Sequence, residues 1–306
     1  MIPLCAPENA KLPTALALGS FDGLHLGHKK VIKAILKEPI GVPTVVSFWP
    51  HPREVLFGES RLRLDLPNEK TFLLEPLGIE QLVLVPFDKN LASKSAETFV
   101  EEILVNTLHA KHIAVGENFR FGRNREGDTS TLKKIGTSLG IKISIVSTVE
   151  DNHGRLSSSR VRKALNEGDL KHAKYLLKRP YTFRGMVEKG RGLGKKIGWP
   201  TANLKIDGRK FLPSLGVYAA WASIANKKER FLAVMNMGPQ PTIDPNSLSA
   251  VEVHILDKEI NLLGHELIVE PVQRIRLQKK FENIEALSKQ ISLDAILAKE
   301  ILTKKL

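Results

Sequence analysis

Apolar residues in the first half of the chain form short runs that alternate with segments of helical spacing. Residues 15–18 and 42–48 are compact apolar runs, as expected for strands that are covered on both faces. The first run is followed by apolar residues at helical spacing in residues 31–35. Because this alternation continues to about Leu177, the sequence predicts a parallel, doubly wound sheet with helices on both sides.

The second half has a different pattern, in which short alternating segments are separated by turn residues. Such spacing predicts an antiparallel β-barrel, and the amphipathic residues 284–302 predict a final helix. The change of pattern divides the chain into a first domain of residues 1–178 and a second of residues 179–306. Six strands are expected in the second domain, at residues 182–188, 201–206, 216–223, 231–237, 250–256 and 266–272.

Composition narrows the classes of function. The 46 Lys and Arg against 33 Asp and Glu give a net charge of +13, which indicates anionic partners such as nucleotides. The charges are scattered and no recognition motif accompanies them, so we expect no nucleic acid partner. The single cysteine, Cys5, excludes an intrachain disulfide and fits a reducing compartment. With no apolar run of membrane length and no convincing signal peptide, we expect a cytoplasmic protein without membrane contact or an obligate protein partner.

Candidate chemistry begins in the turn after the first predicted strand. His25 and His28 lie three residues apart where the next helix should begin, and Gly27 lies between them. Imidazoles beside a helix N-terminus can donate hydrogen bonds to phosphate oxygens, and glycine lets a nucleotide approach the backbone. The spacing of the histidines alone fits a helix N-terminus without a ligand equally well.

The complete string GSFDGLHLGH, residues 19–28, is more specific. It resembles the (H/T)xGH signature of the nucleotidyltransferase superfamily. In this longer form it resembles the adenylyltransferase half of the bacterial bifunctional riboflavin kinase/FAD synthetase family. The resemblance implies that His25 and His28 are catalytic. It also implies nucleotide binding by Gly19, Phe21, Asp22 and Gly27.

Two loops resemble flavin-contacting motifs of the same family. SFWPHP, residues 47–52, ends a predicted strand and resembles T-F-x-P-H-P, which implies a flavin contact for His51. GENFRFG, residues 116–122, alternates aromatic and basic residues and resembles G-x-D/N-F-x-F-G. Without the resemblance, these segments would be a strand-ending turn and an ordinary polar loop. For the second segment the family implies flavin contacts by Asn118, Phe119, Arg120 and Phe121.

A serine-rich helix start completes the first set of motifs. LSSSRVR, residues 156–162, resembles I-S-S-T-x-I-R, the segment that binds the ATP triphosphate in the superfamily. The resemblance implies nucleotide binding by Ser158, Ser159 and Arg162. Hydroxyl groups at this position also fit a simple helix cap.

In the second half, the informative segment is GRGLGKKIGWPTANL, residues 190–204. Its glycines allow the backbone to approach phosphates, and Thr201 and Asn203 share one face of a strand because they are two residues apart. Two neutral oxygens on one face suit Mg²⁺, which also takes phosphate oxygens. PTAN resembles the riboflavin kinase motif, which implies that Thr201 and Asn203 bind Mg²⁺ with the nucleotide. The glycine-rich loop then implies nucleotide binding by Gly190, Gly194 and Lys195.

Further segments follow in the family order, namely NMGPQPT, VEVHILD and NLLG. Within VEVHILD, Glu252 is the expected catalytic base, because riboflavin phosphorylation requires that a primary hydroxyl loses its proton. An exposed strand glutamate is the alternative. Lys195, Leu263 and Trp199 depart from the usual Arg, Tyr and Phe of the family.

The resemblance covers nearly the whole chain and implies two ATP-dependent, Mg²⁺-requiring reactions, from riboflavin to FMN and from FMN to FAD. The fold class implied is a Rossmann-like nucleotidyltransferase domain followed by an antiparallel β-barrel riboflavin kinase domain that ends in a helix. A monofunctional FMN adenylyltransferase with an impaired kinase domain is the main alternative. An adenylyltransferase with another acceptor and a non-enzymatic flavin- or RNA-binding regulator are the others.

Overall fold

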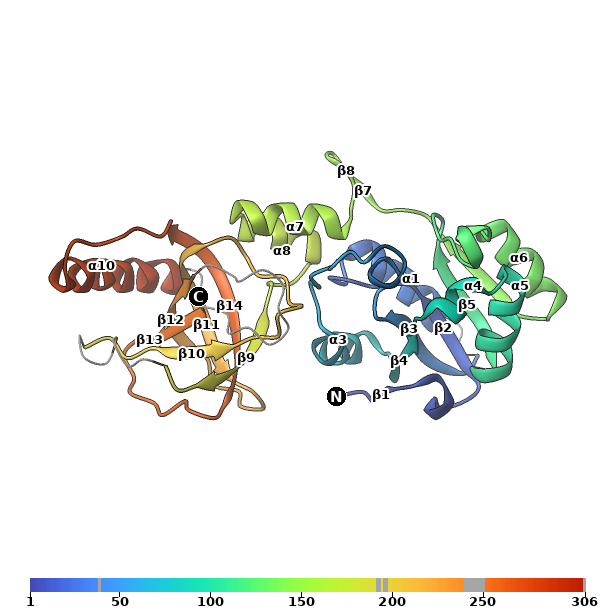
Figure 1. Cartoon of the computed structure of the whole chain (residues 1–306), viewed down its shortest axis with the longest axis horizontal. Coiled ribbons are helices and arrows are strands. Elements are labelled where there is room, and N and C mark those ends of the chain that lie inside the picture. Colours follow the sequence, from blue (N-terminus) through green and yellow to red (C-terminus); the bar gives the residue numbers. More distant parts are fainter. Residues whose placement is uncertain (38–39, 191–193, 195–197, 239–250, 305–306) are drawn as a thin grey trace. The chain divides into compact units, whose positions relative to one another are not determined.

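A computed structural model describes residues 1–37, 40–190, 194, 198–238 and 251–304 (Figure 1). The chain divides into two compact units, which are described separately. The first unit comprises Met1–Arg61 and Asp65–Ser157, and the second comprises Leu62–Leu64 and Ser158–Leu306. The domain boundary expected at residues 178/179 stays a prediction from the sequence pattern.

The first unit is built on a six-stranded sheet in which every neighbouring pair of strands is parallel. The strand order is β1-β4-β3-β2-β5-β6, so β2 lies between β3 and β5. After β2, the next two strands, β3 and β4, lie on one side of it, and the following two, β5 and β6, lie on the other side. This confirms the predicted parallel sheet. The strands are β1 (Leu4–Cys5), β2 (Thr14–Leu18), β3 (Val42–Trp49), β4 (Gln81–Pro86), β5 (Ala110–Gly116) and β6 (Lys142–Val146).

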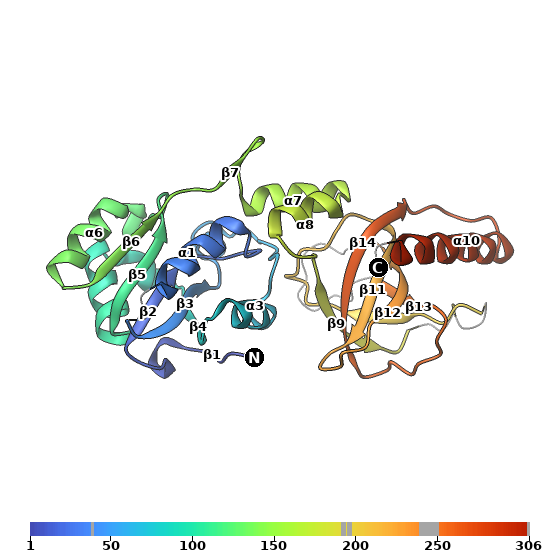
Figure 2. The same ribbon diagram turned by 180° about the vertical axis from the view of Figure 1, so that it is seen from behind.

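Helices cover both faces of this sheet, with α1 on one face and α5 and α6 on the other (Figures 1 and 2). Ser95 caps α5 by accepting a hydrogen bond from the Thr98 backbone N–H at 3.1 Å. The helices are α1 (Leu26–Leu36), α2 (Pro52–Phe57), α3 (Pro67–Leu74), α4 (Lys89–Ser93), α5 (Ala96–Thr98), its wider continuation η3 (Phe99–Thr107) and α6 (Thr129–Ser138). Short 3-10 turns occupy Pro7–Asn9, Glu75–Leu77 and Arg123–Arg125, and β7 (Glu150–Asp151) pairs with β8 (Gly154–Arg155).

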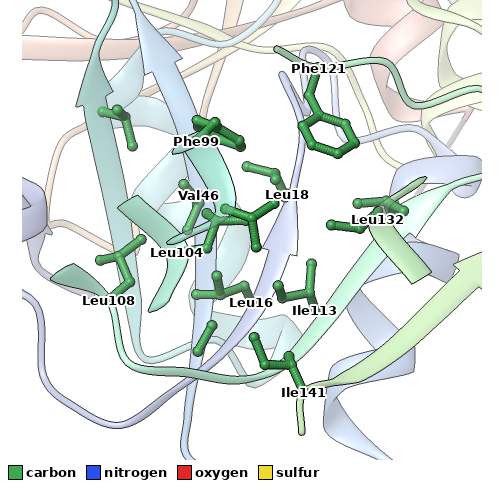
Figure 3. Packing of buried hydrophobic residues seen from close by; sticks show 14 of the residues in the cluster. Leu16, Leu18, Val46, Phe99, Leu104, Leu108, Ile113, Phe121, Leu132 and Ile141 are labelled. Carbon is green, nitrogen blue, oxygen red and sulfur yellow. The ribbon is translucent and has the colours of Figure 1, made fainter. Parts of the chain in front are cut away.

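Strand β2 is buried along its whole length because its side chains alternate between two cores. Ala15 and Ala17 join the core beneath α1, whereas Leu16 and Leu18 join the opposite one. Figure 3 shows Leu16 and Leu18 among the residues of that second core, with Phe121 near one end. Burial of each leucine side chain stabilises the unit by about 1.5–3 kcal/mol. The apolar run in the sequence thus anchors the turn that follows it.

The second unit is a closed barrel with the strand order β10-β13-β12-β11-β14-β9, in which all neighbouring strands are antiparallel. All six predicted strands are present within about two residues of their expected bounds, except that the last one is longer. The strands are β9 (Phe183–Glu188), β10 (Ala202–Lys205), β11 (Gly216–Ile224), β12 (Phe231–Met237), β13 (Val251–Ile255) and β14 (Glu266–Arg276).

Among the described residues of this unit, the helices with given bounds are α7 (Ser158–Glu167), α8 (Leu170–Leu177) and α10 (Ile284–Thr303). The C-terminal half of α10 packs on the barrel through Ala295, Ala298 and Leu302. The predicted final helix is therefore confirmed. Among the helices of the described residues, none is long and apolar enough to cross a bilayer.

Candidate active sites

The turn between β2 and α1 lies at the carboxyl end of the central strand of the first unit. Ligands of parallel sheets bind at such an edge where the strand order reverses, which here is between β2 and its neighbours β3 and β5. Phe21 and Leu24 in this turn have positive φ values of 45° and 43° although neither is a glycine, and both side chains are buried. Such backbone strain persists only where packing imposes it, and it concentrates at functional sites.

The turn brings the two predicted catalytic histidines into direct contact. The rings of His25 and His28 are stacked, with centroids 3.7 Å apart and planes inclined by 23°. The ring of Phe21 meets His28 edge-on at 5.4 Å. A Cβ on Gly27 would lie 3.1 Å from the His25 ring, so glycine leaves the room that this ring needs. The structure thus unites His25, His28, Phe21 and Gly27 as the sequence predicts.

Burial keeps both imidazoles neutral. Burial, followed by the positive charge of Arg155, lowers the pKa of His25 to about 4, although Asp22 opposes the shift. Burial, followed by electrostatic repulsion from a protonated His25 and from Lys70 and Arg155, holds the pKa of His28 well below its usual value. Neither Nδ1 atom has a hydrogen-bond partner among the described residues. At neutral pH the pair can therefore offer N–H donors to a phosphate without carrying charge.

The sequence did not identify Lys70 on α3, although it belongs to this site. Its Nζ donates a hydrogen bond to the carbonyl oxygen of Ser20 at 2.8 Å, and the residue is only 6% exposed. The sequence signal was weak, because a lysine in a predicted helix is normally on the solvent side. Only the packing of α3 against the turn reveals it.

The second motif of the first unit follows β5, the other neighbour of β2. Phe121 is buried in the core and exchanges two backbone hydrogen bonds with Gly127, at 3.1 and 2.9 Å. Phe119 stacks on Phe121 with ring centroids 5.4 Å apart, and it is only half-buried. Arg120 forms an ion pair with Asp128 at 3.0 Å, and Asn118 is exposed. The structure thus makes Phe121 a support for the loop and leaves Phe119 and Asn118 at its surface.

His51 has a local structural role. Its Nδ1 accepts a hydrogen bond from the Arg53 backbone N–H at 3.2 Å, and its own backbone N–H donates to Glu54 at 2.9 Å. These two bonds form a capping box that starts α2. The flavin contact implied for His51 stays a prediction.

The serine-rich motif lies at the start of α7, which belongs to the second unit. There Arg162 donates a hydrogen bond to the Leu62 carbonyl oxygen at 3.2 Å, and its guanidinium lies over the ring of Phe211. Ser158 and Ser159 therefore belong to a different compact unit from His25 and His28. Their joint role in binding a triphosphate stays a prediction.

The second unit contains a cavity of about 810 Å³ at one end of the barrel. Strand pairing aligns six residues around that end, because Asn203 pairs with Glu188 and Glu252, and Asn236 pairs with Glu252 and Val217. Val217 then pairs with Arg276. All six line the cavity. The predicted catalytic Glu252 thus lies between two asparagine side chains, an arrangement that the sequence could not establish.

Gly190 and Gly194 of the glycine-rich segment lie close to Asn203 of β10 and to Trp199 before it. A Cβ on Gly190 would overlap the Asn203 side chain, and one on Gly194 would overlap the Trp199 carbonyl oxygen. Thr201, one residue before β10, lines the same cavity as Asn203, Gly190 and Gly194. The structure therefore brings these predicted residues together, whereas Lys195 lies outside the described residues.

The cavity lining also includes the apolar residues Phe281, Leu287 and Ile291. Asp294 of α10, which is 3% exposed, binds Arg276 with bonds of 2.8 to 3.1 Å. The lining therefore combines apolar groups that suit a ring system with polar groups that suit a polar chain and phosphates.

The oxygen donors of Thr201 and Asn203 suit a hard cation. In the part of the chain that the structure describes, no group of three or more His, Cys, Asp and Glu residues could hold a metal ion. A cation beside Thr201 and Asn203 could also take phosphate oxygens and water as ligands. The donor set thus fits Mg²⁺ bound together with a nucleotide.

The first unit has a parallel sheet with a histidine pair at the point where the strand order reverses. The second unit has a barrel in which two glycines and a carboxylate line one cavity. These features are typical of a two-domain nucleotide-dependent transferase. An FAD synthetase family model matches residues 8–160, and a riboflavin kinase family model matches residues 177–302. The chain belongs to the bifunctional riboflavin kinase/FMN adenylyltransferase family. Both enzyme domains are present, which confirms the bifunctional prediction over the monofunctional alternative.

Individual relatives agree along the whole chain. The bifunctional riboflavin kinase/FMN adenylyltransferase of Haemophilus influenzae is 35% identical over 295 residues, which cover 93% of both chains. That of Escherichia coli is 36% identical over 93% of this chain and 91% of its own. A crystal structure from Streptococcus pneumoniae, described as a macrolide-efflux protein, is 30% identical with a TM-score of 0.82 and covers 97% of this chain and 98% of its own.

Proposed function

We propose that the barrel transfers the γ-phosphoryl group of ATP to the primary hydroxyl of riboflavin, which gives FMN and ADP. The first unit then transfers AMP from a second ATP to the phosphate of FMN, which gives FAD and pyrophosphate. The family of the chain supports both steps. One observation carries the assignment of the two reactions to two sites. Gly190, Thr201, Asn203 and Glu252 line one cavity of the second unit, whereas His25 and His28 stack on each other in the first unit.

In the kinase reaction, Glu252 accepts the proton of the riboflavin hydroxyl as its oxygen attacks the γ-phosphorus. Asn203 and Asn236, its partners on the neighbouring strands, flank the carboxylate. Gly190 and Gly194 let the backbone approach the phosphates of ATP. Thr201 and Asn203 would hold Mg²⁺, which stabilises the negative charge of the phosphates when bound.

The adenylyltransferase reaction requires no strong base, because the phosphate of FMN is already an anionic nucleophile. An oxygen of this phosphate attacks the α-phosphorus of ATP, and pyrophosphate leaves. The neutral rings of His25 and His28 donate hydrogen bonds to the phosphate oxygens on which charge accumulates. Mg²⁺ is proposed at this site also, and Ser158, Ser159 and Arg162 are proposed to bind the triphosphate. Phe119 and Asn118 are proposed to contact the flavin.

These reactions need riboflavin and ATP as substrates, with FMN and FAD as products, and involve no nucleic acid, membrane or obligate protein partner. A cytoplasmic location stays a prediction from the sequence.

The proposal is tested by incubating the purified protein with riboflavin, ATP and Mg²⁺ and separating the flavins over time. We expect FMN first and FAD later, with no FAD when Mg²⁺ is removed by a chelator. FAD formed from added FMN, but no product from riboflavin, would mean that only the first unit is active. FMN without FAD would contradict the role of the histidine pair, and no product from either flavin would contradict both.

A further inference from the structure

Two hydrogen bonds connect the β2–α1 turn to α3 and to the residues just before α3, all within the first unit. The Nζ of Lys70 donates to the Ser20 carbonyl oxygen at 2.8 Å, and Ser20 immediately precedes Phe21. Just before α3, the backbone N–H of Asp65 donates to the Asp22 carboxylate at 3.3 Å. The Ser47 hydroxyl also donates to the Ser20 oxygen, at 3.3 Å. The part of the turn that carries Phe21 is thus fixed from α3 and from the end of β3.

A buried lysine at this position has an energetic cost. Removing an ammonium group from water is unfavourable, so lysine is rarely buried unless its ammonium group has polar partners. Lys70 is nonetheless buried beside two histidines at the ligand-binding edge of the sheet. Its ammonium group therefore contacts the turn that carries Phe21 and lies beside the histidine pair.

The charges around the histidine pair come from three elements. Asp22 and the histidines themselves lie in the turn and α1, Lys70 lies on α3, and Arg155 lies on β8. Lys70 and Arg155 both disfavour protonation of His28 and so lower its pKa, after burial and His25. Removing the charge of Lys70 should therefore raise the pKa of His28.

We infer that Lys70 is a positioning residue for FMN adenylylation, which fixes Ser20 and Phe21 and thereby sets the ring of His28 against the phosphates of ATP. Phe21 transmits the effect, because its ring contacts His28 edge-on at 5.4 Å. This inference rests on the proposed role of the histidine pair.

Three substitutions separate the hydrogen bond of Lys70 from its charge. Lys70→Arg keeps both a donor and the charge, Lys70→Gln keeps only a donor, and Lys70→Met keeps neither. Lys33→Met on the exposed side of α1 is the matched control for loss of one positive charge from the same unit. For each full-length variant, FAD formation from FMN and ATP is measured from about pH 5 to pH 9. FMN formation from riboflavin serves as the internal control.

Lys70→Met should lower kcat for FAD formation by about 10- to 100-fold, the cost of a misplaced catalytic group. In Lys70→Met and Lys70→Gln, the acidic limb of the pH profile should move to higher pH, because protonation of His28 becomes easier. Lys70→Arg should keep the wild-type profile and most of the activity. FMN formation should stay within about twofold in all variants, as should both activities of Lys33→Met.

Wild-type FAD formation in Lys70→Met and Lys70→Gln would overturn the inference. A reduction of FAD formation by the same factor at every pH would also overturn the inference, because a purely structural role of Lys70 would give that result. If Lys70→Met does not fold, Lys70→Gln decides, and failure of both to fold would make Lys70 a stability residue only. Dependence of FAD formation on His28 but not on Lys70 would refute this inference and leave the proposed function intact.

Discussion

At the scale of single residues, the two reactions are assigned to side chains of opposite character. Glu252 is a carboxylate that can accept a proton, whereas His25 and His28 are neutral rings that can donate hydrogen bonds. The kinase must deprotonate a hydroxyl, but the adenylyltransferase begins with a nucleophile that is already ionised. The chemistry of each acceptor thus explains why one site has a carboxylate and the other a shielded imidazole pair.

The two sites should therefore fail separately. His28→Ala should lower FAD formation from FMN by at least about 100-fold, the usual cost of removing one donor to a developing negative charge. It should leave FMN formation from riboflavin nearly unchanged. Separation of flavins after incubation with each substrate measures both rates.

Glu252→Gln should have the reverse effect, with FMN formation reduced by about 100-fold or more through loss of the proton acceptor. When FMN is supplied, FAD formation should remain near the wild-type rate. Loss of both activities in a folded variant of either residue would contradict the assignment of separate sites.

Burial of His25 also predicts how stability depends on pH. The folded state keeps His25 neutral down to about pH 4, whereas the unfolded chain protonates it near its usual pKa of 6.5. The unfolded state then binds more protons, so the free energy of unfolding falls as pH decreases from about 6.5 to 4, by on the order of 3 kcal/mol. His25→Gln should remove this part of the acid sensitivity.

Scanning calorimetry of wild type and His25→Gln between about pH 8 and pH 5 tests this expectation. As the pH falls, the melting temperature of the wild type should decrease more than that of His25→Gln. His153→Gln, which changes an exposed histidine of the same unit, is the control. A difference that does not vary with pH would show that His25 is not buried in its neutral form.

At the scale of elements, the sequence predicted what depends on local pattern. The fully buried run of β2 and the barrel strand Phe231–Met237 are where the pattern placed them, because apolar spacing reports how a strand is covered. The sequence pattern could not predict which residues pair between neighbouring strands. The alignment of Glu252 with Asn203 and Asn236 depends on pairing between residues that are far apart in sequence. For the same reason, Lys70 became visible only through the packing of α3.

The elements also explain why glycine is needed before β10. Gly190 lies so close to Asn203 that an added methyl group would displace the asparagine side chain. Gly190→Ala should therefore lower FMN formation by about 10- to 100-fold while FAD formation from FMN continues. Gly116→Ala, where the added methyl group meets open space, should not affect the kinase rate. Normal kinase activity in Gly190→Ala would show that the position of Asn203 is not critical.

At the scale of the whole molecule, the hydrophobic clusters of the first unit are distinct from the cluster that supports the barrel. The core around Leu16 and Phe121 supports the turn with the histidine pair, whereas Val217, Ala298 and their neighbours support the barrel. Separate cores mean that damage to one need not remove the activity of the other. The two reactions therefore report on the integrity of the two units within one chain.

Leu16→Ala tests this independence. Leu16 is completely buried on β2, and truncation of such a leucine costs about 2–5 kcal/mol. For a unit of this size, that loss lowers the melting temperature by about 5–15 °C. After brief heating across this range, the variant should lose FAD formation at a lower temperature than the wild type but lose FMN formation at the same temperature. Leu302→Ala, which truncates a fully buried side chain of α10 in the second unit, should give the opposite order. If either substitution lowered the inactivation temperature of both activities, the two units would unfold as one cooperative body. Loss of only one activity in a variant would then have to come from a change in that site and not from loss of one core.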